Sequence, residues 1–226
     1  MAREILRLKG VTRDFKEGGQ TIRVLRETNF SIKSGEFVAV IGPSGSGKST
    51  FLTIAGGLQN PTSGKVEING TDITNLSLRE LSAIRLENVG FILQASNLVP
   101  FLTVEKQLTF VDRVMRRPTD KKAMDSLLKA LSIAKLRNKY PGDLSGGERQ
   151  RAAIAKVLYG SSDLILADEP TASLDTTKAF EVVELLAKET HELKKATIMV
   201  THDERLIKYC DAVYEMNDGV LKRRQR

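Results

Sequence analysis

The segment Gly42–Ser49 carries residues of the types and spacing that bind phosphate groups. Its sequence, GPSGSGKS, fits the pattern G-x-x-x-x-G-K-[ST] at every fixed position. An apolar run, Phe37–Ile41, precedes it, and Phe51–Ile54 can continue it as a helix. Glycines allow backbone N–H groups to wrap an anion, and the N-terminus of a following helix adds a favourable dipole. We expect Lys48 to reach the β- and γ-phosphates of ATP and Ser49 to ligate Mg²⁺.

The predicted ATP contacts extend over this whole segment: Gly42, Pro43, Ser44, Gly45, Ser46, Gly47, Lys48, Ser49 and Thr50. The alternative is an ordinary turn, rich in glycine and serine, that happens to precede a helix. The succession of strand, loop and helix favours phosphate binding over that alternative.

Two acidic residues follow another apolar run. Leu164–Ala167 leads directly into Asp168 and Glu169. Two carboxylates at the end of a buried strand lose solvation energy, which suggests a cation and a water molecule beside them. Asp168 fits the Mg²⁺ shell of P-loop enzymes. We expect Glu169 to point to the opposite face and to polarise an attacking water as general base. On its own, such a pair is often the start of a surface loop.

A second glycine-containing segment, Leu144–Gln150, opens a helix that runs to Gly160. Ser145 and Glu148 have the spacing of a capping box, so an ordinary helix start is one interpretation. The two glycines between them, however, each destabilise the first turn by about 1 kcal/mol relative to alanine. A close approach of the backbone to a phosphate is the second interpretation, and it explains the glycines.

Around these segments, short β-branched runs alternate with helical patterns, which predicts an α/β domain with a largely parallel sheet. Strands are predicted at 4–8, 22–32 with a break, 37–41, 65–68, 89–93, 164–167 and 197–200, with a final hairpin of 212–216 and 220–222. Helical patterns cover about 76–86 and 102–134, the latter with a break at Pro118. We therefore predict a single domain, with a catalytic core of about 1–93 and 161–226 and an inserted helical subdomain of about 94–160.

Composition narrows the class of protein. The 226 residues are 41% hydrophobic, enough for one domain with its own core. No apolar run approaches the roughly 20 residues that cross a bilayer, and Met1–Arg7 lacks the apolar centre of a signal peptide. The single cysteine, Cys210, is expected to pack inertly in a reducing compartment. The net charge of +7 is compatible with nucleic acid, an anionic membrane surface or a solvated basic end at 221–226.

The string LSGGERQR at 144–151 is identified as the signature of ABC ATPases, and the other motifs follow in the order of that family. Phe15 resembles the aromatic residue that stacks on adenine, although the family more often has tyrosine there. Gln94 resembles the glutamine that senses Mg²⁺ and the lytic water. Ser173–Asp175 resembles the D-loop, and His202 resembles the switch histidine that contacts the γ-phosphate. The resemblance covers essentially the whole chain.

This resemblance implies the fold of a P-loop NTPase: a RecA-like core with an N-terminal antiparallel β subdomain and an inserted α-helical subdomain. The implied catalytic residues are Glu169, His202, Lys48 and Gln94, and the implied Mg²⁺ ligands are Ser49, Gln94 and Asp168. Two copies would form a homodimer in which each copy presents to its partner's ATP the residues Leu144, Ser145, Gly146, Gly147, Glu148 and Asp175. The resemblance also implies a membrane permease on a separate chain and a peripheral position on the cytoplasmic face of a bacterial cell membrane.

Finer features suggest a subgroup. The short domain and Asn60–Gly64 are similar to the MacB-like group, which serves lipoprotein release, macrolide efflux and resistance to antimicrobial peptides. Residues 89–100 and 201–219 resemble haem-efflux ATPases of Gram-positive bacteria. We therefore expect ATP hydrolysis to power export of haem or of another amphipathic compound. Within the family, residues 94–102 receive the membrane subunit, but packing inside the helical subdomain explains their apolar side chains equally well.

Other functions share some of these motifs. Chromosome-maintenance ATPases insert long coiled coils before the signature, whereas the interval here is compact and has no sustained heptads, so nucleic acid is not an expected partner. A small-molecule kinase has no use for Leu144–Glu148. An ATPase that transmits force through a membrane partner to cell-wall enzymes stays open on the sequence alone.

Overall fold

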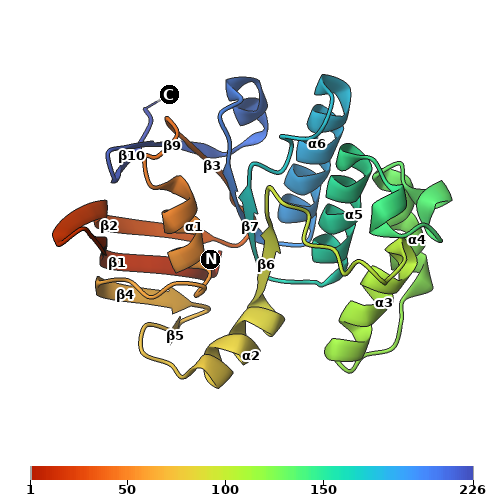
Figure 1. The fold of residues 1–226 in the computed structure, drawn as a ribbon, viewed down its shortest axis with the longest axis horizontal. Coiled ribbons are helices and arrows are strands. Elements are labelled where there is room, and N and C mark those ends of the chain that lie inside the picture. The colour runs from red at the N-terminus through yellow and green to blue at the C-terminus, as the bar shows by residue number, and fades with distance from the viewer. Residues whose placement is uncertain (1, 226) are drawn as a thin grey trace.

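The computed structural model describes residues 2–225, so Met1 and Arg226, at the end of the basic segment, lie outside the described residues. The molecule has two β-sheets and a group of helices (Figure 1). In this view the four-stranded sheet lies on the left, the six-stranded sheet runs from β10 at the upper left to β6 in the centre, and most of the helices lie on the right.

The four-stranded sheet is antiparallel, with the strand order β2-β1-β4-β5. Its strands are β1 (Glu4–Glu17), β2 (Gln20–Lys33), β4 (Ser63–Ile68) and β5 (Thr71–Asp72). A two-residue turn of Gly18 and Gly19, both at positive φ, joins β1 to β2. This is the N-terminal antiparallel sheet that the family resemblance predicts.

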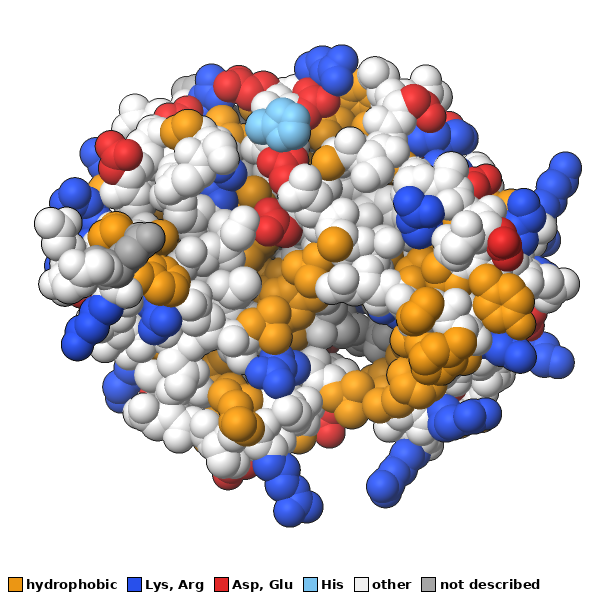
Figure 2. All heavy atoms as spheres, viewed as in Figure 1, with side chains coloured by type: hydrophobic (Ala, Val, Ile, Leu, Met, Phe, Trp, Pro, Cys, Tyr) orange, Lys and Arg blue, Asp and Glu red, His pale blue; other side chains and the backbone are white. Residues whose placement is uncertain are grey.

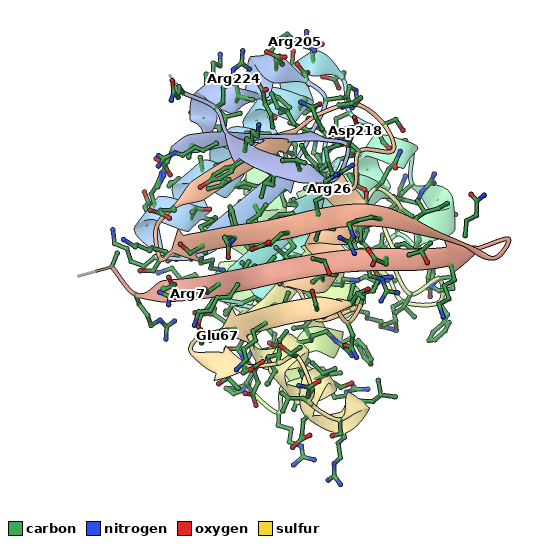
Figure 3. All side chains as sticks on the ribbon, turned by 90° about the vertical axis from the view of Figure 1, so that its left-hand side faces the viewer. Arg7, Arg26, Glu67, Arg205, Asp218 and Arg224 are labelled. Carbon is green, nitrogen blue, oxygen red and sulfur yellow. The ribbon has the colours of Figure 1, made fainter. Side chains whose placement is uncertain are left out.

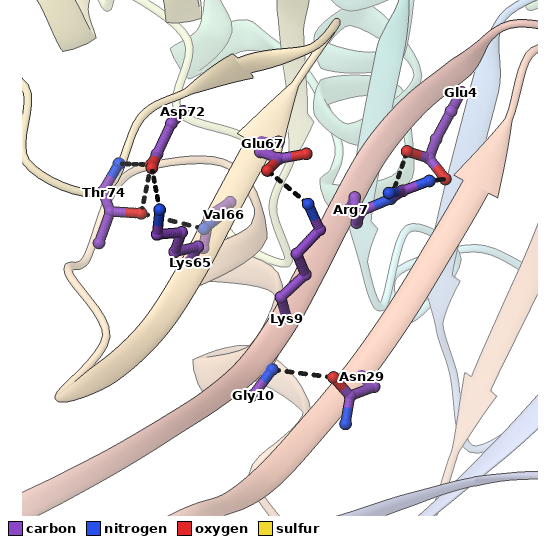
Figure 4. A network of polar contacts seen from close by, with 10 residues as sticks. All are labelled: Glu4, Arg7, Lys9, Gly10, Asn29, Lys65, Val66, Glu67, Asp72 and Thr74. Carbon is purple, nitrogen blue, oxygen red and sulfur yellow. Dashed lines mark hydrogen bonds and ion pairs between the residues drawn. The ribbon is translucent and has the colours of Figure 1, made fainter.

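The outer face of this sheet is polar (Figure 3). Lys9 Nζ lies 2.8 Å from Glu67 Oε1, and Lys65 Nζ lies 3.8 Å from Asp72 Oδ2 (Figure 4). Asp72 also accepts hydrogen bonds from the backbone N–H and the hydroxyl of Thr74, which lowers the pKa of its carboxyl. Because these pairs are exposed, they contribute little stability and mainly keep this face solvated.

The six-stranded sheet has the order β10-β9-β3-β8-β7-β6. Its strands are β3 (Phe37–Ile41), β6 (Val89–Ile92), β7 (Leu164–Asp168), β8 (Ala196–Val200), β9 (Ala212–Asn217) and β10 (Val220–Arg223). All are parallel except β10, which pairs antiparallel with β9. The carboxyl ends of the parallel strands therefore share one edge of the sheet.

The central strands of the six-stranded sheet are buried on both faces, which explains why they read as continuous apolar runs. All five residues of β3 are buried. Their side chains alternate between two cores: Phe37 and Ala39 face the core that contains α5 and α6, whereas Val38 and Val40 face the core shared with α1 and the first sheet.

The helices are α1 (Lys48–Ala55), α2 (Leu78–Asn88), α3 (Val104–Val114), α4 (Lys121–Ala130), α5 (Gly146–Tyr159) and α6 (Thr176–Glu192). Three short 3₁₀ turns cover Ala134–Leu136, Pro141–Asp143 and Glu204–Tyr209. Helices α3 to α5 come between β6 and β7 in the chain. The exact limits of a helical subdomain stay a prediction.

The predicted fold class is confirmed, and most predicted elements occur within a few residues of their expected ends. The first strand is longer than predicted, and β5 was not predicted. The expectation of a mostly helical stretch over 102–134 with a break at Pro118 is confirmed. Helix α3 ends at Val114, and α4 begins after Asp120, whose carboxylate accepts the N–H of Ala123.

Candidate functional site

A cavity at the carboxyl edge of the six-stranded sheet brings together most of the predicted site residues. Its volume is about 530 Å³. The loop between β3 and α1 forms one wall, with the ends of β7 and β8 opposite. The predicted residues that line it are Gly42, Ser44, Gly45, Gly47, Lys48, Ser49, Thr50, Gln94, Asp168, Glu169 and His202.

The loop holds its shape because other backbone segments approach it closely. A Cβ atom on Gly42 (φ +150°) would lie 2.1 Å from the carbonyl oxygen of Met216, and one on Gly47 (φ +105°) would lie 2.7 Å from that of Val24. Gly45 (φ +78°) has open space around it instead. Two of the glycines are therefore needed for packing as well as conformation, whereas Gly45 leaves room on the cavity side.

Polar groups within the loop bond to its own backbone. Lys48 Nζ donates to the carbonyl oxygens of Gly42 at 2.8 Å and Pro43 at 2.6 Å. Ser46 is buried; its N–H donates to Pro43 O, and its carbonyl accepts the N–H of Gly219 at 3.0 Å. Neither Pro43 nor Ser46 lines the cavity, unlike their predicted neighbours. Ser46 therefore links the loop to the β9–β10 hairpin.

Asp168 and Glu169 both line this cavity, so the expectation that they point to opposite faces is wrong. Strand alternation ends at Asp168, because Glu169 has a φ of +48°. Its N–H donates to Val200 O at 3.0 Å, which holds this turn against β8. A residue other than glycine in this conformation costs about 1–2 kcal/mol. Such strain is concentrated at functional sites.

His202 follows β8 and reaches across the cavity mouth. Its Nδ1 lies 3.0 Å from Glu169 Oε2. The histidine side chain is 74% exposed, whereas the glutamate side chain is 17% exposed. The preceding residue, Thr201, is buried, and its N–H donates to Val40 O. The structure therefore fixes the base of this segment and leaves the imidazole accessible beside the carboxylate.

The glycine segment at the start of α5 lies on a different cavity, of about 420 Å³. Gly146 lines it together with Ser173, and Gln94 lines both cavities. None of the other predicted partner-facing residues lines the phosphate-loop cavity: Leu144, Ser145, Gly147, Glu148 and Asp175. One copy of the chain thus does not bring these residues to its own phosphate loop.

The first turn of α5 fits both interpretations of its sequence. Ser145 Oγ accepts the N–H of Glu148 at 3.3 Å, and Glu148 Oε2 accepts the N–H of Ser145 at 2.7 Å. The second bond is the main reason that the pKa of Glu148 is lowered. A Cβ atom on Gly147 would lie 3.0 Å from Ser173 O, so that glycine is explained within the chain. A Cβ atom on Gly146 would meet nothing closer than 3.9 Å.

Two more predicted residues stand apart from the cavity. Phe15 lies on β1 outside the cavity lining, and the Arg13 guanidinium carbon lies 4.6 Å from the centre of its ring. Asp175 precedes α6, where its carboxylate accepts the N–H of Lys178 at 2.9 Å. Asp175 therefore has a helix-capping contact that explains it within one copy of the chain.

Sequence reasoning missed several residues that hold the site. Met216 and Gly219 of the β9–β10 hairpin support the phosphate loop through their backbone atoms. Gln150 Nε2 donates to Leu93 O at 3.2 Å, and Lys156 Nζ donates to Asn97 O at 3.0 Å, so α5 anchors both sides of Gln94. Backbone contacts of this kind leave no pattern in the sequence. Of these residues, Gln150 could have been singled out from the sequence, because it lies in the signature string. The structure shows that it is buried.

The donor set fits a nucleotide bound with a small divalent cation. The open space at Gly45 and the N-terminus of α1 suit a phosphate chain. No group of three or more His, Cys, Asp and Glu side chains within residues 2–225 forms a metal site of its own. Ser49 and Asp168 line the cavity together, and Mg²⁺ is commonly held by one or two carboxylates plus phosphate oxygens.

Comparisons with known proteins agree with this site. The family model described as ABC transporter matches residues 25–172. The putative hemin import ATP-binding protein HrtA of Staphylococcus aureus (strain MRSA252) is 44% identical over 217 residues, which cover 95% of this chain and 97% of the relative. No helix within residues 2–225 is long and apolar enough to cross a bilayer.

Solved structures of ABC transporter proteins have the same fold as this chain. A dimeric structure of the ATP-binding cassette MJ0796, bound to ADP and Pi, has a TM-score of 0.90 and 35% identity, covering 98% of this chain and all of that one. The cbiO1 protein of Clostridium perfringens, part of the ABC transporter complex cbiONQ, has a TM-score of 0.83 and 31% identity, covering 97% and 87%.

A glycine-built loop between a parallel strand and a helix, facing two carboxylates, defines a P-loop nucleotide-hydrolysing protein. With the family match and these relatives, the chain belongs to the ABC transporter family, as an ATP-binding subunit that hydrolyses ATP.

Proposed function

We propose that two copies of this chain sandwich two ATP molecules, drive a separate membrane subunit, and export haem. The dimer is supported mainly by one observation: the signature segment and the phosphate loop line different cavities within one copy of the chain. A second copy can supply that segment, with its open Gly146, to the triphosphate. The related cassette MJ0796 has a dimeric structure bound to ADP and Pi, which supports this arrangement.

In this proposal the chain's own residues divide the work. Lys48 exchanges its bonds to the Gly42 and Pro43 carbonyls for the β- and γ-phosphates. Ser49, Asp168 and Gln94 would hold Mg²⁺, which when bound would supply positive charge against the phosphates. Glu169 accepts a proton from the attacking water, and His202, 3.0 Å away, orients that carboxylate and contacts the γ-phosphate.

The remaining predicted contacts complete the proposed site. Phe15 stacks on adenine, and the backbone N–H groups of 42–50 cradle the phosphates. Leu144, Ser145, Gly146, Gly147, Glu148 and Asp175 act from the partner subunit.

Two neighbouring glycines allow a matched test of the dimer. Gly146→Ala meets open space within one copy and should leave folding intact, but its methyl group should obstruct the partner's triphosphate and slow ATP hydrolysis. Gly147→Ala should instead lower thermal stability, because its Cβ would press on Ser173 O. ATPase rate and ATP-dependent dimerisation by gel filtration provide the measurements. A Gly146→Ala protein with normal turnover and normal dimerisation would remove the signature segment from this role.

We place the membrane subunit against the exposed loop before α3. Phe101 is 75% exposed, and Phe110 and Val114 on α3 are also exposed. Figure 2 shows hydrophobic side chains gathered on the lower right of this face, in the region of α3. Gln107, fully buried, holds the loop by bonding to Val99 N–H, Val99 O and Leu102 O. Leu98 instead packs on the core, which supports internal packing for that residue, while we assign docking to the exposed Phe101.

A variant at the tip of this loop tests the docking. Phe101→Ala should keep the basal ATPase rate and lose the stimulation that the membrane subunit gives. Phe110→Ala is the matched variant on α3. Unchanged stimulation in both variants would move the docking surface elsewhere. A peripheral position on the cytoplasmic face of a bacterial membrane follows from this docking.

The cargo is the part of the proposal that rests on relatives. The protein of Staphylococcus aureus at 44% identity is described as a putative hemin import protein, whereas residues 89–100 and 201–219 resemble efflux ATPases. A strain without this chain should grow poorly in excess haemin if the transporter exports haem. The wild-type chain should restore growth and Glu169→Gln should not. Normal growth in haemin, with failure to use haem as the iron source, would reverse the direction to import.

A further inference from the structure

A second large cavity lies at the opposite edge of the six-stranded sheet from the phosphate loop. Its volume is about 820 Å³. Asp163 and Lys195, which directly precede β7 and β8, are at its sheet end. The chain makes six residue steps of about 3.3 Å each from Lys195 to Thr201, which separates this cavity from the His202 segment by about 20 Å. The two cavities therefore share strands but no lining residue.

Lys195 is the unusual residue in this cavity. The residue as a whole is only 5% exposed, and among the described residues its ammonium has no hydrogen bond or ion pair; the Nζ atom itself is not fully buried and opens to the cavity. Burial lowers the pKa of this ammonium, although Glu189 and Asp163 oppose the effect from a distance. Its backbone is fixed on both sides, since its N–H donates to Thr190 O and its carbonyl accepts the N–H of Gly35. A buried cation held in place without a partner is unfavourable unless something else compensates it.

The nearby charges do not supply that compensation. Asp163 pairs with Arg3, with Arg3 Nη2 2.7 Å from Asp163 Oδ2. Arg117 pairs with Asp112, with Nε 2.8 Å from Oδ1. Asp120 accepts the N–H of Ala123. These three groups are thus engaged with other residues. Lys188 and Glu189 also line the cavity, and Glu189 acts on the Lys195 ammonium only from a distance, without a hydrogen bond or ion pair, so Lys195 is left facing the cavity.

The rest of the wall is apolar and comes from three helices. Leu127 and Ala130 of α4, Leu158 of α5 and Leu185 of α6 line it. Figure 1 shows these three helices side by side on the right of the molecule. Small inorganic anions would leave this wall uncovered, and an uncharged apolar molecule would leave Lys195 without a partner. Among the described residues that line the cavity, Tyr159 is the only aromatic one, and its hydroxyl donates to Asp112 Oδ2, so the lining offers no free ring to stack on a nucleotide base.

We propose that this cavity binds an amphipathic monoanion, with its acidic head on the Lys195 ammonium and its hydrocarbon body against α4, α5 and α6. The acidic head satisfies the buried cation, and the hydrocarbon covers the leucine side chains, so one molecule compensates both unfavourable features. The site is separate from the ATP site and does not depend on the proposed cargo.

The experiment uses 8-anilinonaphthalene-1-sulfonate, which is fluorescent, apolar and singly charged, as the probe on the full chain. The probe should bind saturably, and saturating Mg-ATP should not displace it. Decanoate, below its micelle concentration, should displace the probe, and uncharged decanol should do so about tenfold less well, as expected for loss of one charge-assisted contact.

Three variants locate the site. Lys195→Met should weaken probe binding about tenfold and should make decanoate and decanol equal. Ala130→Phe, which fills the apolar end and keeps Lys195, should also weaken it. Lys122→Met, an exposed lysine on α4 outside the cavity, is the matched control and should bind as wild type. The proposal is overturned if wild type does not bind the probe saturably, if Mg-ATP displaces it, or if both cavity variants bind as wild type.

Discussion

The two edges of the six-stranded sheet hold cavities of opposite construction. At the carboxyl edge the walls are largely backbone: glycines at positive φ, carbonyl groups within 2.1–2.7 Å of where a Cβ would be, and the turned residue Glu169. At the amino edge the walls are side chains from α4, α5 and α6 around Lys195. At the carboxyl edge, close backbone contacts restrict which residue types can occupy the loop. At the amino edge, the cavity requires only a positive charge and an apolar wall.

The largest expected effect is on catalysis at the carboxyl edge. Glu169→Gln keeps the shape of the side chain but cannot accept the proton, so ATP hydrolysis should fall by about 10²- to 10⁴-fold. ATP binding should persist, because the phosphate loop is untouched, and the dimer should accumulate with Mg-ATP. Phosphate release and gel filtration measure the two outcomes. If the variant hydrolysed ATP at the wild-type rate, Glu169 would not be the base, and catalysis would no longer distinguish the cavity at the carboxyl edge from the one at the amino edge.

The next effect separates backbone packing from backbone conformation in the phosphate loop. Gly45→Ala has only the positive φ to accommodate, which costs about 1–2 kcal/mol. Gly42→Ala adds a collision with Met216 O and should cost about 2–5 kcal/mol in total. Urea unfolding without nucleotide gives both values, with Gly45→Ala as the matched control. Equal losses in the two variants would contradict the close packing of the hairpin against this loop.

The smallest effect has the opposite sign and belongs to the amino edge. Lys195→Met should raise the free energy of unfolding by about 1–2 kcal/mol at neutral pH, because it removes an unpaired buried cation. The pKa of Lys195 is lowered below its usual 10.5, so between the folded pKa and 10.5 the unfolded chain holds more protons. Wild-type stability should therefore rise with pH in that window, and the advantage of the variant should shrink.

Urea unfolding at neutral pH and near pH 10 checks this prediction, and Lys122→Met controls for loss of a surface charge. A Lys195→Met protein that is less stable than wild type would mean that the ammonium stabilises the fold, and the contrast between the two edges would fail.

The same contrast explains what the sequence could predict. The backbone-built cavity comes from contiguous segments, so spacing alone located Gly42–Ser49 and the acidic pair. Spacing could not show that Glu169 turns to φ +48° and joins Asp168 in one cavity, because β8 imposes that turn through the Val200 carbonyl. Nor could it show that Ser46 is buried and lies outside the cavity lining.

The side-chain cavity left no comparable pattern. Its walls come from segments near 117–130, 158–163 and 185–195, which meet only after the helices have packed. In the sequence, Lys195 is one lysine beside another and is indistinguishable from a solvated pair. The two roles of the signature glycines likewise depend on the folded chain, because Ser173 O and Leu174 Cδ2 lie close to a Cβ on Gly147 but not to one on Gly146.

The hairpin beneath the phosphate loop has a consequence for biogenesis. Residues 42–47 leave the ribosome long before Met216 and Gly219, whose backbone groups hold them in place. Until that late segment emerges, a nascent chain has the loop's sequence but not its support. The ability to bind ATP should thus appear only after Met216 and Gly219 have left the ribosome, so that a shorter nascent chain should not hydrolyse ATP.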